Sequence, residues 1–256
     1  MEFIDSHTHL YLPEFDNDRD EVIRRALDNN VSKMLLPNIN AGTIDDIINL
    51  SVKYPGICYP MTGLHPTSVN SEFEDQLQAV KDSLSPYNFI AIGEIGIDLY
   101  WDKTYFREQE KAFREQINIA VREDLPVVIH SRESIDEIIE IIDDENPEGL
   151  KGVFHSFTGT ADQAKKIVER GFYIGTGGIM TFKNSGLDSV IKDIDIEKIL
   201  LETDSPYLAP VPKRGKRNES SYVRYIADKL ANIKGLTVKE VAGITTNNCK
   251  NLFNLE

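Results

Sequence analysis

All five histidines of the chain lie at or just after the carboxyl end of a segment that is expected to form a strand. Glu94 ends a similar segment, and Asp204 closely follows another. Imidazole and carboxylate groups bind divalent cations, and burying them is costly unless they are paired or coordinated. The pattern therefore indicates a metal site, whose candidate ligands are His7, His9, Glu94, His130, His155 and Asp204.

One residue separates His7 from His9. In an extended segment, side chains at this spacing point the same way, so the two imidazoles can hold one cation between them. Considered alone, each candidate also has a structural interpretation: Glu94 as an ion-paired carboxylate, His155 as a hydrogen-bonded core histidine, and Asp204 as a helix cap. The placement of all the candidates at strand ends favours coordination.

The six candidate ligands exceed what one tetrahedral site needs. A bridging carboxylate such as Glu94 can hold two cations about 3.5 to 4 Å apart, as in two-metal hydrolases. We therefore predict two divalent metal ions per chain. A mixed set of histidines and carboxylates suits Mg, Mn, Zn or Co, so the ligand types do not select one metal.

Short apolar segments rich in Ile and Val alternate with longer amphipathic segments along the whole chain. This alternation is typical of a parallel sheet covered by helices, and eight such units predict a (β/α)8 TIM barrel. We expect one domain over residues 1–256, with the carboxyl ends of all strands on one face. The alternative is an open doubly wound sheet, which should carry a Gly-rich phosphate loop where this chain has Ser6-His-Thr-His9. The expected strands are 3–5, 33–37, 57–62, 89–93, 127–129, 152–154, 172–175 and 199–201.

Several local features are consistent with this plan. The segment 106–121 is expected to be a helix with Phe106, Phe113, Ile117 and Val121 on one buried stripe. Thr158 or Thr160 is expected to cap a helix that ends at Gly171, and Gly149 follows a helix that starts near Ser134. The two cysteines, Cys58 and Cys249, are expected to be buried thiols.

The chain is acidic, with a formal net charge of −14. This charge repels a polyanion at long range, so a nucleic-acid substrate would need a local cationic feature. The one dense cationic stretch contains Lys213, Arg214, Lys216 and Arg217. No apolar run approaches the roughly 20 residues that cross a bilayer, and no secretion signal begins the chain, so we expect a cytoplasmic protein. Nothing in the sequence implies a membrane or an obligate protein partner.

Six groups of residues along the chain form recognisable motifs. They are Asp5-Ser-His-Thr-His9, Gly63-Leu-His-Pro66, Gly93-Glu-Ile-Gly-Ile-Asp98 with Tyr100-Trp-Asp-Lys103, Val128-Ile-His-Ser131, His155-Ser-Phe157, and Leu201-Glu-Thr-Asp-Ser-Pro206 with Arg214-Gly-Lys-Arg-Asn-Glu219. Together, these motifs resemble those of the TatD family of metal-dependent deoxyribonucleases, within the amidohydrolase-like barrels, over nearly the whole chain. Many relatives carry a histidine two residues after the position of His65, where this chain has Thr67.

The resemblance implies that one cation binds His7, His9, Glu94 and Asp204, and that a second binds Glu94, His130 and His155. It also implies hydrolysis of phosphodiester bonds in DNA, with removal of nucleotides from single-stranded ends in the 3′ to 5′ direction. Two cations would activate a water molecule, with Asp204 as general base and Glu94 as the second catalytic residue. The expected substrate contacts are His65, Tyr100, Trp101, Lys103, Arg214, Lys216, Arg217 and Asn218.

Two other classes of function remain open at this point. Related barrels hydrolyse small amides, lactones or phosphotriesters on the same scaffold, although many of those enzymes place a modified lysine where this chain has Glu94. Hydrolysis of an aminoacyl ester on tRNA lies between that class and a nuclease. A noncatalytic metal-binding scaffold is the other alternative, but a structural site would close with four protein ligands.

Overall fold

The computed structural model describes residues 1–145 and 147–256. Its strands are all parallel and form two hydrogen-bonded groups, one in the order β1-β2-β3 and one in the order β4-β5-β6-β7-β8. The strands are β1 (Phe3–Asp5), β2 (Val31–Leu36), β3 (Cys58–Pro60), β4 (Ile92–Asp98), β5 (Val127–Arg132), β6 (Gly152–Phe154), β7 (Tyr173–Thr176) and β8 (Ile199–Leu201).

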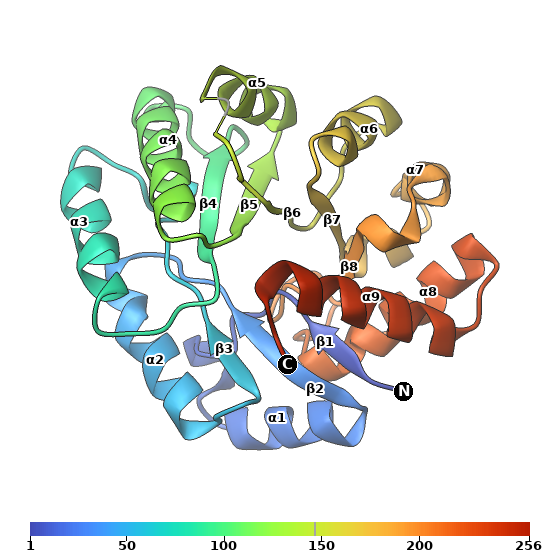
Figure 1. The fold of residues 1–256 in the computed structure, drawn as a ribbon. Coiled ribbons are helices and arrows are strands. Elements are labelled where there is room, and N and C mark those ends of the chain that lie inside the picture. The colour runs from blue at the N-terminus through green and yellow to red at the C-terminus, as the bar shows by residue number, and fades with distance from the viewer. Residues whose placement is uncertain (146) are drawn as a thin grey trace.

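Backbone contacts connect the two groups at both seams. Between β3 and β4, Thr62 bridges to Ile92, and the amide of Gly93 donates to the carbonyl of Thr62 at 2.8 Å. Between β8 and β1, the amide of Ser6 donates to the carbonyl of Leu201 at 3.0 Å. The strands therefore form a closed ring, and the helices surround it (Figure 1). The predicted (β/α)8 architecture is confirmed.

Helices follow the strands and cover the outside of the ring (Figure 1). They are α1 (Arg19–Asp28), α2 (Ile44–Lys53), α3 (Phe73–Leu84), α4 (Phe106–Arg122), α5 (Ile135–Glu145), α6 (Ala161–Glu169), α7 (Leu187–Asp193), α8 (Val223–Lys234) and α9 (Val238–Phe253). Short 3-10 helices cover Pro13–Phe15, Ala41–Thr43, Pro66–Ser68, Gly178–Thr181, Ile196–Lys198 and Ser220–Tyr222. In the described residues, no helix combines the length and apolarity needed to span a bilayer.

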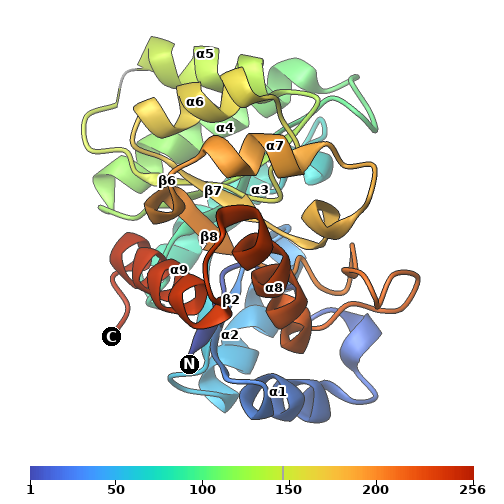
Figure 2. The same cartoon turned by 90° about the vertical axis from the view of Figure 1, so that its right-hand side faces the viewer.

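The last helix, α9, closes one end of the barrel. Its residues Cys249, Leu252 and Phe253 pack against side chains from several strands, including Ile4 and Val128, in one buried apolar cluster. Figure 2 shows α9 and both termini at one end of the barrel, and the orange loop that follows β8 at the other. Because α9 occupies the amino-terminal end of the strands, the carboxyl-terminal end is left for a functional site.

Most predicted elements are confirmed, and strand four is the main correction. It was expected at 89–93, but β4 runs from Ile92 to Asp98, because the Gly-rich segment continues its pairing with β5 as far as Arg132. Phe89 instead packs in a separate apolar cluster. Glu94 therefore lies inside β4 and not at its end.

Among the smaller predictions, Thr160 caps α6 in a capping box with Gln163, as expected. Cys58 and Cys249 are buried free thiols, also as expected, and burial raises the pKa of Cys58 to about 12. Phe113 and Ile117 are buried in α4, but Val121 is 38% exposed because the buried face of the helix ends at Ala120.

Gly96 lies in β4 where no side chain fits. Its φ is +141°, and an added Cβ would lie 2.0 Å from the carbonyl oxygen of His130. We expect Gly96→Ala to lower the free energy of unfolding by about 2 to 4 kcal/mol, through backbone strain and overpacking. Urea denaturation measures this change. Gly243→Ala is the control because its Cβ would meet open space in α9; equal destabilisation by both changes would contradict the assignment.

Candidate metal centre

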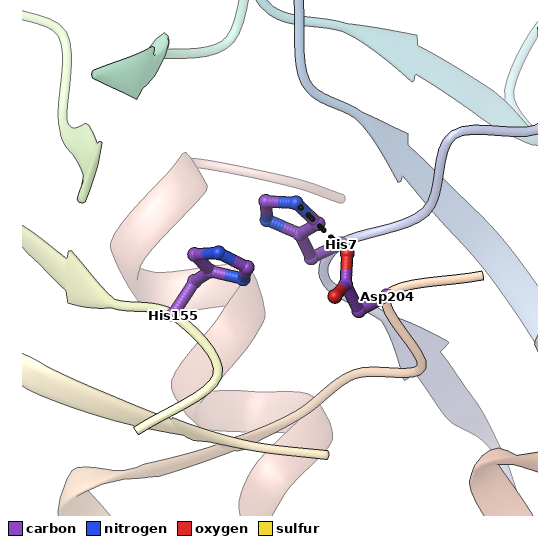
Figure 3. A group of neighbouring side chains, drawn as sticks. All are labelled: His7, His155 and Asp204. Atoms are coloured by element: carbon purple, nitrogen blue, oxygen red, sulfur yellow. Dashed lines mark ion pairs between the residues drawn. The ribbon is translucent and has the colours of Figure 1, made fainter. Parts of the chain in front are cut away.

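The predicted ligands meet at the carboxyl-terminal end of the barrel. His7 and His9 follow β1, His155 follows β6, and Asp204 follows β8, whereas Glu94 and His130 lie within β4 and β5. Figure 3 shows three of them, His7, His155 and Asp204, gathered from distant parts of the chain. The rings of His7 and His155 are stacked, with centroids 3.8 Å apart.

Each histidine of the chain lies close to one or the other carboxylate oxygen of Glu94. One oxygen faces the pair that follows β1, and the other faces the remaining three histidines. From Oε2 the distances are 3.1 Å to His7 Nε2 and 3.7 Å to His9 Nε2; from Oε1 they are 2.8 Å to His130 Nδ1, 2.8 Å to His155 Nε2 and 3.2 Å to His65 Nε2. Glu94 thus lies between two groups of potential ligands, as a bridging carboxylate would.

Asp204 completes the group on the Oε2 side. Its Oδ1 lies 3.5 Å from His9 Nε2 and 3.8 Å from His7 Nε2. The backbone at Asp204 is left-handed, with φ of 56°, and its amide donates to the carbonyl of His7 at 2.9 Å. Strained non-glycine residues of this kind often occur at functional sites. The side chain is 14% exposed, so it combines ligand contact with access to solvent.

Hydrogen bonding around His9 identifies a lone pair that is directed into this group. The Tyr11 hydroxyl donates to the carbonyl of Pro37 at 2.8 Å, so it accepts from His9 Nδ1 at 2.9 Å. His9 Nε2 therefore carries no proton in the neutral ring. It nevertheless lies 3.3 Å from His7 Nε2 and close to two carboxylates. Electron-rich atoms at such distances suit a cation between them, so the donor set fits a divalent metal.

The hydroxyl of Tyr11 positions a ligand without lying among the ligands. We expect Tyr11→Phe to weaken binding of a divalent cation by about 10-fold or more, because the His9 tautomer is no longer selected. Competition with a chromophoric chelator measures the affinity. Tyr59→Phe, which changes a partly exposed tyrosine on β3, is the control. Equal affinities of the wild-type and Tyr11→Phe proteins would contradict this role.

Two further carboxylates, which were not among the predicted site residues, contact the ring nitrogens of His130 and His155 that face away from Glu94. Asp98 Oδ2 lies 2.9 Å from His130 Nε2, and Glu202 Oε1 lies 3.4 Å from His155 Nδ1 while it accepts from the amide of Ser156 at 2.5 Å. Both are buried. Such carboxylates orient imidazoles and raise their basicity. Their place inside the Gly93–Asp98 and Leu201–Pro206 motifs was the available signal.

These neighbours control the protonation of the histidines. Burial lowers the pKa of His155, but Glu94 and Glu202 outweigh this effect and raise the pKa overall. Burial also lowers the pKa of His130, but Asp98 and Glu94 outweigh it and raise that pKa. Burial lowers the pKa of His7, with a further contribution from His155. Burial opposes ionisation of Glu94, but the surrounding histidines hold its pKa well below the ordinary value.

Raised pKa values at His130 and His155 predict a pH dependence of cation binding. A histidine must be neutral to bind a metal, so binding should release protons near neutral pH, and affinity should rise as the pH rises through these pKa values. Calorimetric titration in buffers of different ionisation enthalpy measures the released protons. Binding that releases no protons and is independent of pH would contradict this assignment.

A cavity of about 650 Å³ opens over the candidate ligands. Two predicted substrate residues, His65 and Trp101, line it, together with Thr67, Arg132 and Tyr207. His65 is also part of the ligand cluster, with Nε2 3.2 Å from Glu94 and Nδ1 2.7 Å from the Thr67 hydroxyl. Thr67, where many relatives carry a histidine, therefore supports His65 directly.

Other predicted substrate residues have partners within the protein. Arg217 binds Asp18 with both terminal nitrogens, at 2.8 and 2.7 Å. The side-chain amide of buried Asn218 donates to two backbone carbonyls. Arg214 stacks on Phe182. Lys103 lines a separate cavity beside α4, and Lys216 is exposed in the loop after β8. Because Arg217 and Asn218 stabilise this loop, we leave them out of the proposed substrate site.

The sequence and the fold of this chain are similar to those of several known proteins. A model of the family described as TatD related DNase matches residues 4–254. An uncharacterized metal-dependent hydrolase of Bacillus subtilis, YabD, is 38% identical over 252 residues, which cover 98% of each protein. The 3′-5′ ssDNA/RNA exonuclease TatD of Salmonella typhimurium is 31% identical and covers 97% of this chain and 98% of its own. The crystal structure of the TatD homologue YjjV from Escherichia coli has a TM-score of 0.93 at 30% identity, covering 99% and 98% of the two chains.

Proposed function

Because the chain belongs to the TatD-related DNase family of metal-dependent hydrolases, we propose that it removes nucleotides from the 3′ end of single-stranded DNA by hydrolysing phosphodiester bonds. The relative from Salmonella typhimurium, whose name states this activity, supports the choice of substrate. The observation that carries the proposal is the position of Glu94 between two groups of histidines.

In this proposal the chain holds two divalent cations. His7, His9, Glu94 and Asp204 hold the first, and Glu94, His130 and His155 hold the second. When bound, such cations lower the pKa of a water molecule and neutralise charge on the phosphate. The ligand types leave Mg, Mn, Zn and Co as candidates.

Asp204 is the proposed general base. Burial would raise its pKa, but the nearby His9, His155 and His7 lower it overall, so the carboxylate is ionised at neutral pH. Its partial exposure lets it take a proton from the attacking water while it still contacts His9. On the other side of Glu94, His65 faces the cavity and is placed to contact a phosphate oxygen.

A panel of substrates tests this function. The metal-reconstituted protein is assayed on single-stranded DNA labelled at either end, on RNA, on aminoacyl-tRNA and on small esters, with Asp204→Asn as the blank. We expect loss of the 3′-terminal label first and no activity after chelation. Turnover of a small ester or of aminoacyl-tRNA without cleavage of DNA would contradict the proposal and favour the corresponding alternative.

A further inference from the structure

Arg132 lies at the end of β5, at the mouth of the cavity over the ligands. Only Ser131 separates it from His130 along the strand, so both side chains point to the same side. Among the described residues that line this cavity, it is the only lysine or arginine. The dense cationic stretch of the sequence, Lys213 to Arg217, lies after β8 and does not include it.

The Arg132 guanidinium is held by aromatic rings and not by a carboxylate. Its central carbon lies 3.8 Å from the ring centroid of Tyr100 and 5.2 Å from that of Trp101. Within residues 1–145 and 147–256, its side chain forms no hydrogen bond or ion pair, although the chain has 42 acidic residues. Arg217, by contrast, is paired with Asp18. Arg132 is thus positioned while its nitrogens stay free for an anion.

The two aromatic rings are exposed but anchored. Tyr100 is 50% exposed and Trp101 is 68% exposed. The backbone amides of both donate to Asp98 Oδ1 at 3.0 and 3.1 Å, and the other oxygen of Asp98 contacts His130. This loop is therefore tied to a candidate metal ligand, and it presents a large apolar ring beside a cation at the cavity mouth.

From this arrangement we infer that Arg132 and Trp101 form a binding subsite for an unpaired nucleotide next to the bond that is cut. Arg132 binds a backbone phosphate, and the ring of Trp101 stacks on the neighbouring base. The inference rests on the proposed nuclease function and extends it. Stacking requires a base that is free of a duplex, and the guanidinium requires an anion, so an uncharged ester without an aromatic ring would use neither group.

Trp101 is the only tryptophan of the chain, so its fluorescence reports on this subsite directly. Asp204→Asn protein with Mg²⁺ is titrated with a short single-stranded thymidine oligonucleotide, and quenching gives the dissociation constant. We expect binding to quench Trp101. The double variant that combines Asp204→Asn with Arg132→Gln should have a dissociation constant about tenfold higher than Asp204→Asn alone. It should also reduce the slope of log affinity against log salt concentration by about 0.7, the value for one phosphate contact on a single strand.

The matched control is Arg24→Gln, which changes an exposed arginine on α1, and it should alter neither the affinity nor the salt slope. Arg132→Lys should restore the salt slope because it keeps the charge. An unchanged affinity and slope in Arg132→Gln, or binding without quenching, would overturn the subsite. If binding quenches Trp101 and depends on Arg132, but the metal-loaded wild-type protein cuts no DNA, the subsite is kept and the nuclease is rejected. DNA cleavage with an unchanged KM in Arg132→Gln would keep the nuclease and reject the subsite.

Discussion

Glu94→Gln is expected to bind at most one divalent cation per chain and to lose more than about 100-fold in DNA hydrolysis. Loss of an outer-shell partner of a metal ligand already costs about 10- to 100-fold in affinity or activity, and Glu94 is itself a proposed ligand. It is also the only group that contacts both sets of histidines through opposite oxygens among the described residues. A neutral amide would supply one weak oxygen ligand, and its NH2 group would face the other set.

Metal analysis after equilibrium dialysis gives the cation count for this variant, and the urea midpoint shows whether it is folded. Glu110→Gln, on α4 outside this cluster, is the matched control and should keep both cations and full activity. A folded Glu94→Gln protein that retains two cations and most of its activity would remove the bridging role.

The second large effect is expected for Asp204→Asn. This change keeps the shape of the side chain but removes its ability to accept a proton, so kcat should fall by about 100- to 10,000-fold. The neighbouring ligands His7 and His9 remain, and the fold should be intact because the backbone amide and carbonyl of Asp204 still bond to His7 and Tyr207. The measurement is single-turnover cleavage of a labelled oligonucleotide at saturating metal.

Asp16→Asn serves as the comparison for Asp204→Asn, since Asp16 is an exposed carboxylate that pairs only with Arg19 in the described structure. It should cleave DNA at the wild-type rate. If Asp204→Asn kept most of its activity at saturating metal, the general base would have to be another residue.

Much of the fold could be predicted because its determinants are local. Apolar segments such as 152–154 and 199–201 are short, buried and followed by amphipathic helices, and the structure has strands at the same residues. The histidines and Asp204 come at or just after the ends of the strands expected from the sequence, so the barrel geometry places them on one face. The contact of all five histidines with Glu94 follows from that placement.

The parts that could not be predicted depend on pairing between distant segments. The Gly-rich run after Glu94 gives no strand signal by itself, and only its register with β5 extends β4 to Asp98. Charge clusters were misleading for the same reason: Arg217 meets Asp18, 199 residues away. Arg132, a single cation on a strand, is distinguished only by the aromatic loop that packs against it.

Anomalous diffraction from crystals of the metal-loaded protein tests the central claim most directly, because it locates each cation relative to Glu94. We predict two peaks about 3.5 to 4 Å apart, one beside each Glu94 oxygen. The first peak should lie among His7, His9 and Asp204, and the second beside His130 and His155. A single peak at full occupancy, or two peaks that do not share Glu94, would contradict a bridged pair of cations as the basis of this site.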